Sequence, residues 1–415
     1  MKRRMSFFLL VFCSLLAANA AADEWRQFRG PGGNGFSAER NLPLKWSSTN
    51  NLSWKAKLPG PGASSPIVLG ERVYLTCYSG YWENQQAPGD MDDLRLHLVC
   101  CSAKSGKTIF DRKLKPTLPE SRRVRDHGYA AATPVTDGRM LYVFFGKSGV
   151  YSFDLEGTQQ WNTKVGSRTH GWGCGTSPVL YRDLVIVNAS VESGSLVALN
   201  KNSGKEVWRA PGMRSSWNTP NLVQTADGKT ELVVSVRGRI LGFDPQNGNQ
   251  LWFCDGVQDY VCPSVISQNG IAYVIGGRSS VAIAIRSGGR GDVTETHVQW
   301  RARAGANVCS PVIVNGHMYW VSDRNRSAYC VNIENGKVVH SRRFRAQPYA
   351  SAVAGDGKVY IVTRSGGTFV MAAKPSFKQL AHNKLDDKTR FNASPAIANG
   401  KLYVRSNQYL YCIGK

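Results

Sequence analysis

Leu199-Asn200-Lys201-Asn202-Ser203-Gly204-Lys205-Glu206-Val207-Trp208 is the stretch of sequence that decides the fold. A continuous apolar run ends at Leu199, a polar turn with Gly204 follows, and a second short run ends in Trp208. Glycine supplies the positive φ that tight turns between antiparallel strands require. The same interval from a glycine to a ring-bearing residue recurs in four more places: Gly106/Phe110, Gly157/Trp161, Gly248/Trp252 and Gly336/His340. One structural unit is therefore copied along the chain.

Each copy also opens in the same way, with a small residue, then usually proline, then apolar residues. The openings are Ser65-Pro66, Thr133-Pro134, Ser177-Pro178, Thr219-Pro220, Cys262-Pro263, Ser310-Pro311, Ser351-Ala352 and Ser394-Pro395. They recur about every 43 residues, the length of a four-stranded propeller blade, and the longer first interval holds an insertion near residues 79–94. A turn such as Asn399-Gly400 and an alternating strand such as 401–404 follow each opening, as in a hairpin.

The eighth copy stops after its third strand, and the segment 51–55 before the first copy has the missing pattern, with Trp54 in the aromatic position. We therefore predict an all-β fold: an eight-bladed β-propeller of four-stranded antiparallel blades, closed by an N-terminal strand that completes the last blade. Closure of this kind removes exposed sheet edges. The aromatic residue of each copy is expected to fill the wedge between neighbouring blades. The predicted divisions are a signal peptide at 1–22, an N-terminal extension at 23–50 and a single propeller at 51–415.

The first 22 residues have the pattern of a cleaved secretory signal. Basic residues 2–4 precede an apolar run at 7–16, and small residues at 18–22 allow cleavage after Ala20 or Ala22. Cys13 follows Phe12, where a lipoprotein signal needs a small residue, so we do not expect lipidation. No other stretch has 18 apolar residues in a row. The sequence thus predicts a periplasmic or secreted protein, not a lipoprotein and not an integral membrane protein.

The composition of the 415 residues bears on partners and on covalent chemistry. The 52 Lys and Arg residues exceed the 29 Asp and Glu residues, giving a formal net charge of +23, or about +20 without the three basic residues of the leader. Because an exported chain does not meet nucleic acid, an acidic glycan or an envelope protein is the expected partner. Nine cysteines follow the leader. Cys254 with Cys262 is the pair best placed for a disulfide, Cys100-Cys101 is a strained alternative, and most of the nine are expected in the core.

The combination of Ser/Thr-Pro-Val/Ile with Gly-Lys-x-x-Trp at this period resembles the pyrroloquinoline-quinone-type (PQQ-like) propeller repeat. The segment 25–35, Trp-Arg-Gln-Phe-Arg-Gly-Pro-Gly-Gly-Asn-Gly, resembles the opening of exported proteins with this repeat. The resemblance implies one of two roles. Quinoprotein dehydrogenases hold the quinone and Ca²⁺ at the ring centre, whereas BamB-like propellers of the outer-membrane barrel-assembly machinery are non-catalytic scaffolds. The chain is shorter than typical quinoprotein propellers and cannot be matched to their Ca²⁺ ligands and base, and it lacks the lipidation cysteine of the scaffold.

The loops that lead into the innermost strand of each blade, here called the mouth loops, should surround one end of the central channel. Six of the eight carry an arginine and six carry an aromatic residue. Arginine offers a planar fork for carboxylate or phosphate, and aromatic rings offer stacking faces. The predicted ligand-binding residues are Arg125, Tyr129, Arg168, Trp172, Arg214, Trp217, Asn218, Tyr260, Asn307, Arg345, Tyr349, Arg390, Phe391 and Asn392.

The same loops contain weaker candidates for catalysis. His127, with Asp126 beside it, and His170 in the next copy could exchange protons. The asparagines Asn218, Asn307 and Asn392 could offer oxygens to Ca²⁺, but no cluster of carboxylates accompanies them, so no metal site is predicted and no cofactor is assigned.

We therefore expect a binding or scaffolding module for an anionic ligand, an envelope polysaccharide or a protein partner. The alternatives are a PQQ-dependent dehydrogenase with His127 or Asp126 as the base, for which PQQ and Ca²⁺ would be the cofactors, and a polysaccharide-modifying enzyme. The oligomeric state stays open.

Overall fold

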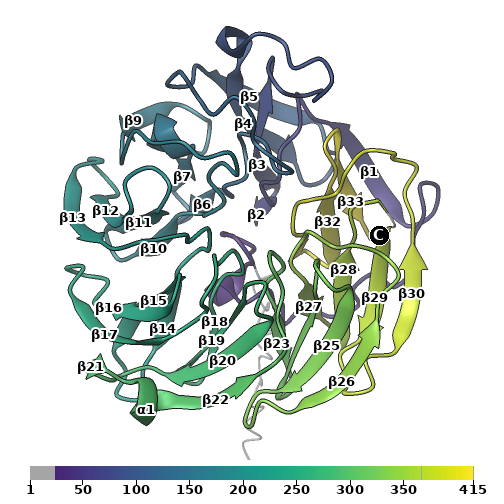
Figure 1. Ribbon diagram of the computed structural model, residues 1–415. Helices are drawn as coiled ribbons and strands as arrows, with labels where there is room; N and C mark the ends of the chain where they lie inside the picture. The colour runs from purple at the N-terminus through teal and green to yellow at the C-terminus, as the bar shows by residue number, and fades with distance from the viewer. Residues whose placement is uncertain (1–23, 366, 415) are drawn as a thin grey trace, which may run out of the picture.

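The computed structural model describes residues 24–365 and 367–414. The predicted leader lies outside this part of the chain. Eight antiparallel sheets radiate from a central channel (Figure 1), so the chain is an all-β, eight-bladed propeller as predicted. Helical segments are short: η1 (Pro31–Gly33), η2 (Met91–Asp93), η3 (Gly146–Ser148) and α1 (Thr294–His297).

Each blade runs from an inner to an outer strand in chain order. Blade 1 consists of β2 (Ile67–Leu69), β3 (Arg72–Ser79), β4 (Arg95–Ser102) and β5 (Thr108–Leu114), and blade 2 of β6 (Val135–Thr136), β7 (Met140–Phe144), β8 (Val150–Asp154) and β9 (Gln159–Thr163). Blade 3 consists of β10 (Val179–Tyr181), β11 (Leu184–Ala189), β12 (Ser195–Asn200) and β13 (Glu206–Pro211), and blade 4 of β14 (Asn221–Gln224), β15 (Thr230–Val236), β16 (Arg239–Phe243) and β17 (Gln250–Asp255). The short β21 (Gly291–Asp292) adds a fifth, parallel strand to blade 4.

Blades 5 to 8 continue the ring. Blade 5 consists of β18 (Ile266–Gln268), β19 (Ile271–Gly276), β20 (Val281–Arg286) and β22 (Val298–Ala302), and blade 6 of β23 (Val312–Val314), β24 (His317–Val321), β25 (Ser327–Asn332) and β26 (Val338–Arg343). Blade 7 consists of β27 (Val353–Gly355), β28 (Lys358–Val362), β29 (Thr368–Ala372) and β30 (Gln379–Asn383), and blade 8 contains β31 (Ala396–Ala398), β32 (Lys401–Arg405) and β33 (Tyr409–Ile413). Blade 8 is completed by β1 (Leu52–Lys57), which pairs with β33. The predicted closure is confirmed.

Neighbouring blades are joined near the channel by a series of hydroxyl groups. The backbone N–H of Ser65 donates to the hydroxyl of Thr133 in the next blade at 2.9 Å, and the same bond repeats around the ring through Ser177, Thr219, Ser264, Ser310, Ser351 and Ser394. The blade 5 member is Ser264, and β18 begins at Ile266, so the opening of that copy is Ser264-Val265. The alignment on Cys262-Pro263 was wrong by two residues.

The recurrent aromatic residue fills the space between blades, as expected. Trp54, Trp161, Trp208 and Trp300 each donate their indole N–H to a backbone carbonyl of the following blade. Each ring also lies flat against a glycine of that blade's last turn. A Cβ on Gly106, for example, would be 2.5 Å from the Trp54 ring. Trp252 is different, because it donates to Glu231 of its own blade at 2.7 Å.

Residues 24–50 pack across the end of the channel opposite the mouth loops (Figure 1, purple). This segment forms backbone bridges to blade 1 at Val68 and to blade 7 at Ala354. Its Asn34 exchanges two hydrogen bonds with Ser267 of blade 5, and Glu39 accepts the N–H groups of the 399–400 turn in blade 8. Arg29 is buried and donates to the carbonyl oxygens of Pro311, Ala352 and Asn34. The extension is thus the floor of the propeller.

The nine cysteines of the described residues are all free thiols, and seven of them are buried. The expected Cys254–Cys262 pairing is wrong because Cys254 lies on β17, an outer strand, whereas Cys262 lies in a mouth loop beside the channel. No helix in 24–365 or 367–414 is long and apolar enough to cross a membrane.

Candidate functional site

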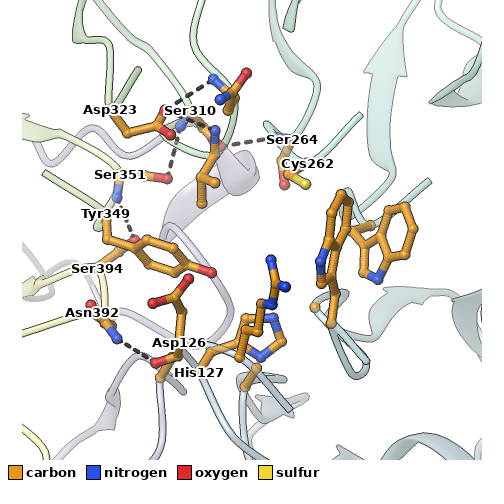
Figure 2. Close-up of a pocket in the computed structure, with 18 of the residues that line it drawn as sticks. Asp126, His127, Cys262, Ser264, Ser310, Asp323, Tyr349, Ser351, Asn392 and Ser394 are labelled. Atoms are coloured by element: carbon orange, nitrogen blue, oxygen red, sulfur yellow. Dashed lines mark hydrogen bonds between the residues drawn. The ribbon is translucent and has the colours of Figure 1, made fainter. Parts of the chain in front are cut away.

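The mouth loops enclose a cavity of about 340 Å³ at the centre of the ring, here called the mouth cavity (Figure 2). Each loop connects the outer strand of one blade with the inner strand of the next, so a ring of eight blades directs eight loops to one axis. The hydroxyl groups of Ser177, Ser264, Ser310, Ser351 and Ser394 surround its lower part, and Phe28 of the N-terminal segment closes the bottom.

Three aromatic side chains from blades 2 to 5 form one wall of the mouth cavity. The ring centres of Trp172 and Trp217 are 5.0 Å apart, and those of Trp172 and Tyr260 are 4.7 Å apart. The Trp217 indole N–H donates to the carbonyl of Gly173 at 2.9 Å, which fixes its orientation. The guanidinium of Arg278 lies 5.4 Å from the centre of the Tyr260 ring, close enough for a cation–π contact.

The opposite wall is polar and contains a charge network around Asp126. Its carboxylate lies 2.7 Å from a guanidinium nitrogen of Arg364 and 3.2 Å from one of Arg390. Its carbonyl oxygen accepts the side-chain amide of Asn392 at 2.5 Å. Arg364 also covers the ring of Tyr349, 4.4 Å from its centre. Asp126 is held in this network, and Tyr349 and His127 lie beside it in Figure 2.

Asp323 and two asparagines complete the polar lining. One Asp323 oxygen accepts the backbone N–H groups of Asn307 and Val308 at 2.9 and 3.0 Å. Burial nevertheless raises the pKa of Asp323 from its ordinary value. The side-chain oxygens of Asn307 and Asn392 are buried and have no hydrogen-bond partner among the described residues. Because buried acceptors are nearly always paired, these two oxygens are unsatisfied acceptors on residues that line the cavity.

Two more arginines are buried in the propeller without a carboxylate partner in the described chain. Arg29 donates only to backbone carbonyls, and burial lowers its pKa to about 9, so it remains charged at neutral pH. Arg405 is also buried and donates to the carbonyls of Ser64 and Thr76 at 3.0 and 2.7 Å. Three guanidinium groups (Arg125, Arg278 and Arg364) line the cavity together with two carboxylates, those of Asp126 and Asp323. The positive excess favours an anion.

The structure brings together about half of the residues predicted from the sequence. Arg125, Asp126, His127, Trp172, Trp217, Tyr260, Asn307, Tyr349 and Asn392 line the mouth cavity. Three others, Arg168, His170 and Arg214, are exposed outside the cavity, and Arg345 and Arg390 line an adjoining hollow. Two aromatic residues pack on neighbouring rings: Tyr129 on Tyr78 and Tyr81, and Phe391 on Tyr411. Asn218 is buried. The Asn218 amide donates to Ser235 and Ser216 inside the blades.

Sequence reasoning missed the loops that join the second and third strands, which reach the same mouth. Arg278, Asp323 and Arg364 each follow the end of a second strand by two residues, after β19, β24 and β28. That shared position is the signal that could have found them. Phe28 was missed because nothing in the sequence places the N-terminal segment across the channel.

The cavity does not match a Ca²⁺ site. No group of three or more His, Cys, Asp or Glu residues that could hold a metal occurs in the described part of the chain. Asp126 is paired with two arginines, and an Asp323 oxygen is bound to backbone N–H groups. Burial lowers the pKa of His127 and raises that of the Cys262 thiol, so a neutral imidazole and an un-ionised thiol line the wall. No step of a quinone–Ca²⁺ reaction is assigned to these residues.

The sequence matches the family model described as outer membrane protein assembly factor BamB over residues 93–225 and 236–415. The chain belongs to this family. Its members carry the PQQ-like repeat, so the resemblance inferred from the repeats is confirmed. A comparison with curated proteins found no match.

Solved structures of the same architecture are distant in sequence. BamB from Moraxella catarrhalis is 13% identical, with a TM-score of 0.62 over 88% of this chain and 97% of that chain. Quinohemoprotein alcohol dehydrogenase from Comamonas testosteroni is 11% identical, with a TM-score of 0.68 over 96% of this chain and 82% of that chain. A computationally designed protein, Ika8, is 10% identical with a TM-score of 0.58 over 86% and 98%. These likenesses establish the fold and leave the function to the site.

Proposed function

We propose that the chain is an exported, non-catalytic binding module whose mouth cavity holds an anionic, hydroxyl-rich ring, such as an acidic sugar. The excess of guanidinium groups over carboxylates around the cavity carries this proposal. Arg125 is exposed at the cavity and Arg278 lies against Tyr260, so both can turn toward a carboxylate. A charge-assisted hydrogen bond of this kind contributes roughly 1.5–3 kcal/mol.

The unpartnered oxygens of Asn307 and Asn392 support a ligand with hydroxyl groups. A carboxylate alone brings only acceptors, which suit arginine but leave both amide oxygens without a donor. Sugar hydroxyls donate and accept, so a uronic acid meets both needs. The rings of Trp172 and Tyr260 offer flat apolar faces to the C–H face of a sugar. The family description, which names an outer-membrane protein assembly factor, is consistent with a binding role in the cell envelope.

The test is a calorimetric titration of the mature protein with digalacturonate, with neutral galactobiose as the comparison ligand. We expect saturable binding of the acidic disaccharide only. Arg125→Gln with Arg278→Gln should weaken it by at least tenfold, because two charged donors are removed. The matched control, Arg168→Gln with Arg214→Gln, removes the same charge from mouth loops outside the cavity and should change affinity less than twofold. Absence of binding, or equal losses in both variants, would refute the proposal.

A quinone ligand is the second candidate, because an aromatic wall beside arginines also suits a planar polycarboxylate such as PQQ. One calorimetric series with PQQ, with and without Ca²⁺, separates the two. One-to-one binding that Ca²⁺ strengthens would favour an oxidoreductase. Weak binding indifferent to Ca²⁺ is expected here, since the cavity lacks a carboxylate cluster for the metal.

A further inference from the structure

Two hollows continue outward from the mouth cavity over blades 6 to 8. The first, of about 460 Å³, shares Arg364 and Gln347 with the cavity. The second, of about 480 Å³, shares Arg345 and Ala346 with the first and lies between β26 and the strands β29 and β30. Because lining residues are shared at both junctions, the three spaces lie next to one another in a row from the cavity outward. We call the two hollows the basic groove, after the residues Arg326, Arg342, Arg343, Arg345, Lys384 and Arg390.

The basic groove is lined by one sign of charge. No acidic residue is among the described residues that line either hollow. Arg364 and Arg390 are paired with Asp126 at the cavity edge, whereas the other five cations that line the groove form no ion pair within the described chain. Five unneutralised positive charges along the groove create a positive electrostatic potential that favours the binding of an extended anion.

The outer hollow also has an apolar base. The rings of Phe344 and Phe369 are buried and lie 4.6 Å apart, and Phe369 stacks on His382 at 4.0 Å. Arg342, Arg343 and Lys384 stand at the edges of this base. A surface of flat rings bordered by cations suits a chain of sugar rings that bear carboxylates.

We propose that the basic groove holds the rest of an acidic polysaccharide whose terminal ring lies in the mouth cavity. This inference rests on the proposed function, because it extends the same site from one ring to a chain. Phe28 of the N-terminal segment lines the cavity, and this segment packs on blades 1, 5 and 7 at the opposite end, so we expect a chain end in the cavity to leave through the mouth. The path through Arg364 and Arg345 gives it a charged exit between blades 6 and 7.

The experiment compares digalacturonate with decagalacturonate on the mature protein, by calorimetry at two salt concentrations. We expect the longer chain to bind at least tenfold more tightly, with a steeper loss of affinity in high salt. Arg342→Gln, Arg343→Gln and Lys384→Gln together should reduce that gain to less than threefold and leave digalacturonate binding unchanged, which also shows that the variant is folded. The control, Lys104→Gln, Lys107→Gln and Lys205→Gln, removes three exposed charges from turns at the opposite end of the blades and should keep the full gain.

Several results would overturn this proposal, and they differ from those that refute the cavity. Digalacturonate binding without a gain for the longer chain leaves the cavity standing and removes the groove. Equal losses of decagalacturonate affinity in the groove and control variants would show that the gain for the longer chain depends only on the net charge of the protein. A ten-residue polyglutamate that binds as tightly as decagalacturonate would assign the groove to an acidic protein segment instead. Decamer binding that needs the groove but not Arg125 and Arg278 would keep the groove and refute the cavity.

Discussion

Ring closure makes a quantitative prediction at the contact between Trp54 and Gly106. Trp54 belongs to the closing strand β1 and is 8% exposed, and its indole N–H donates to Ala103 of blade 1 at 2.9 Å. Gly106 has φ +71°, and an added Cβ would lie 2.5 Å from the Trp54 ring. Gly316 is the matched control, because its φ is +73° and a Cβ there would meet nothing within 4 Å.

The expected free energies of unfolding follow from these differences. Alanine at either glycine costs about 1–2 kcal/mol for the left-handed backbone. Gly106→Ala adds an overpacking cost of about 1–3 kcal/mol, because the indole must move. Trp54→Ala removes a buried ring, at about 3–5 kcal/mol. In the double variant the clash is gone, so the two changes should be coupled by about 1–3 kcal/mol.

Urea unfolding followed by far-ultraviolet circular dichroism measures the unchanged protein and all four variants without depending on tryptophan fluorescence. The reasoning is refuted if Gly106→Ala and Gly316→Ala destabilise equally, or if the changes at Trp54 and Gly106 are additive. Either result would mean that the indole does not hold the closing strand to blade 1.

Three further predictions concern the scaffold. Ser264→Ala removes the acceptor of the Thr219 N–H and should lower the free energy of unfolding by about 1–3 kcal/mol in the same assay. Burial raises the pKa of Glu192 to about 8, above the unfolded value near 4.5. The free energy of unfolding should therefore fall as pH rises from 4.5 to 8, by up to about 1.4 kcal/mol per pH unit. A Glu192→Gln variant that keeps the full slope would contradict this. Arg29→Met removes the hydrogen bonds that tie the floor to the carbonyls of Pro311 and Ala352. It should hasten proteolysis within residues 24–50, measured by mass spectrometry, and unchanged cleavage rates would argue against the floor contacts.

The fold was predictable because its determinants are local and repeated. A glycine such as Gly204 indicates a tight turn, and a ring such as that of Trp161 indicates an inter-blade contact. The number of repeated copies gives the number of blades. The error in blade 5 has a physical reason. The hydrogen-bonded series needs a hydroxyl, supplied by Ser264, and the proline at 263 is not part of it.

The site was only half predictable, because it depends on contacts across the ring. The mouth loops could be located from the period, which is why Trp172 and Tyr349 were found. No local sequence pattern distinguishes Arg364, which forms an ion pair with Asp126 from a blade far along the chain. Nor does any local pattern show that the Asn218 side chain is hydrogen-bonded within the blades and so does not reach the cavity. Charge composition predicted an anionic partner without indicating where the charges are left unpaired.

The position of residues 24–57 has a consequence for the order of assembly. These residues are made before any blade, yet they dock on surfaces completed much later: Ser53 of β1 binds the carbonyl of Gly414, 361 residues away. Contacts of such separation slow folding. Until β1 arrives, the outer edge of β33 is an unpaired strand that another chain could join. A segment synthesised before every blade is therefore the last to be placed, and the nascent protein is most vulnerable to aggregation in the interval between.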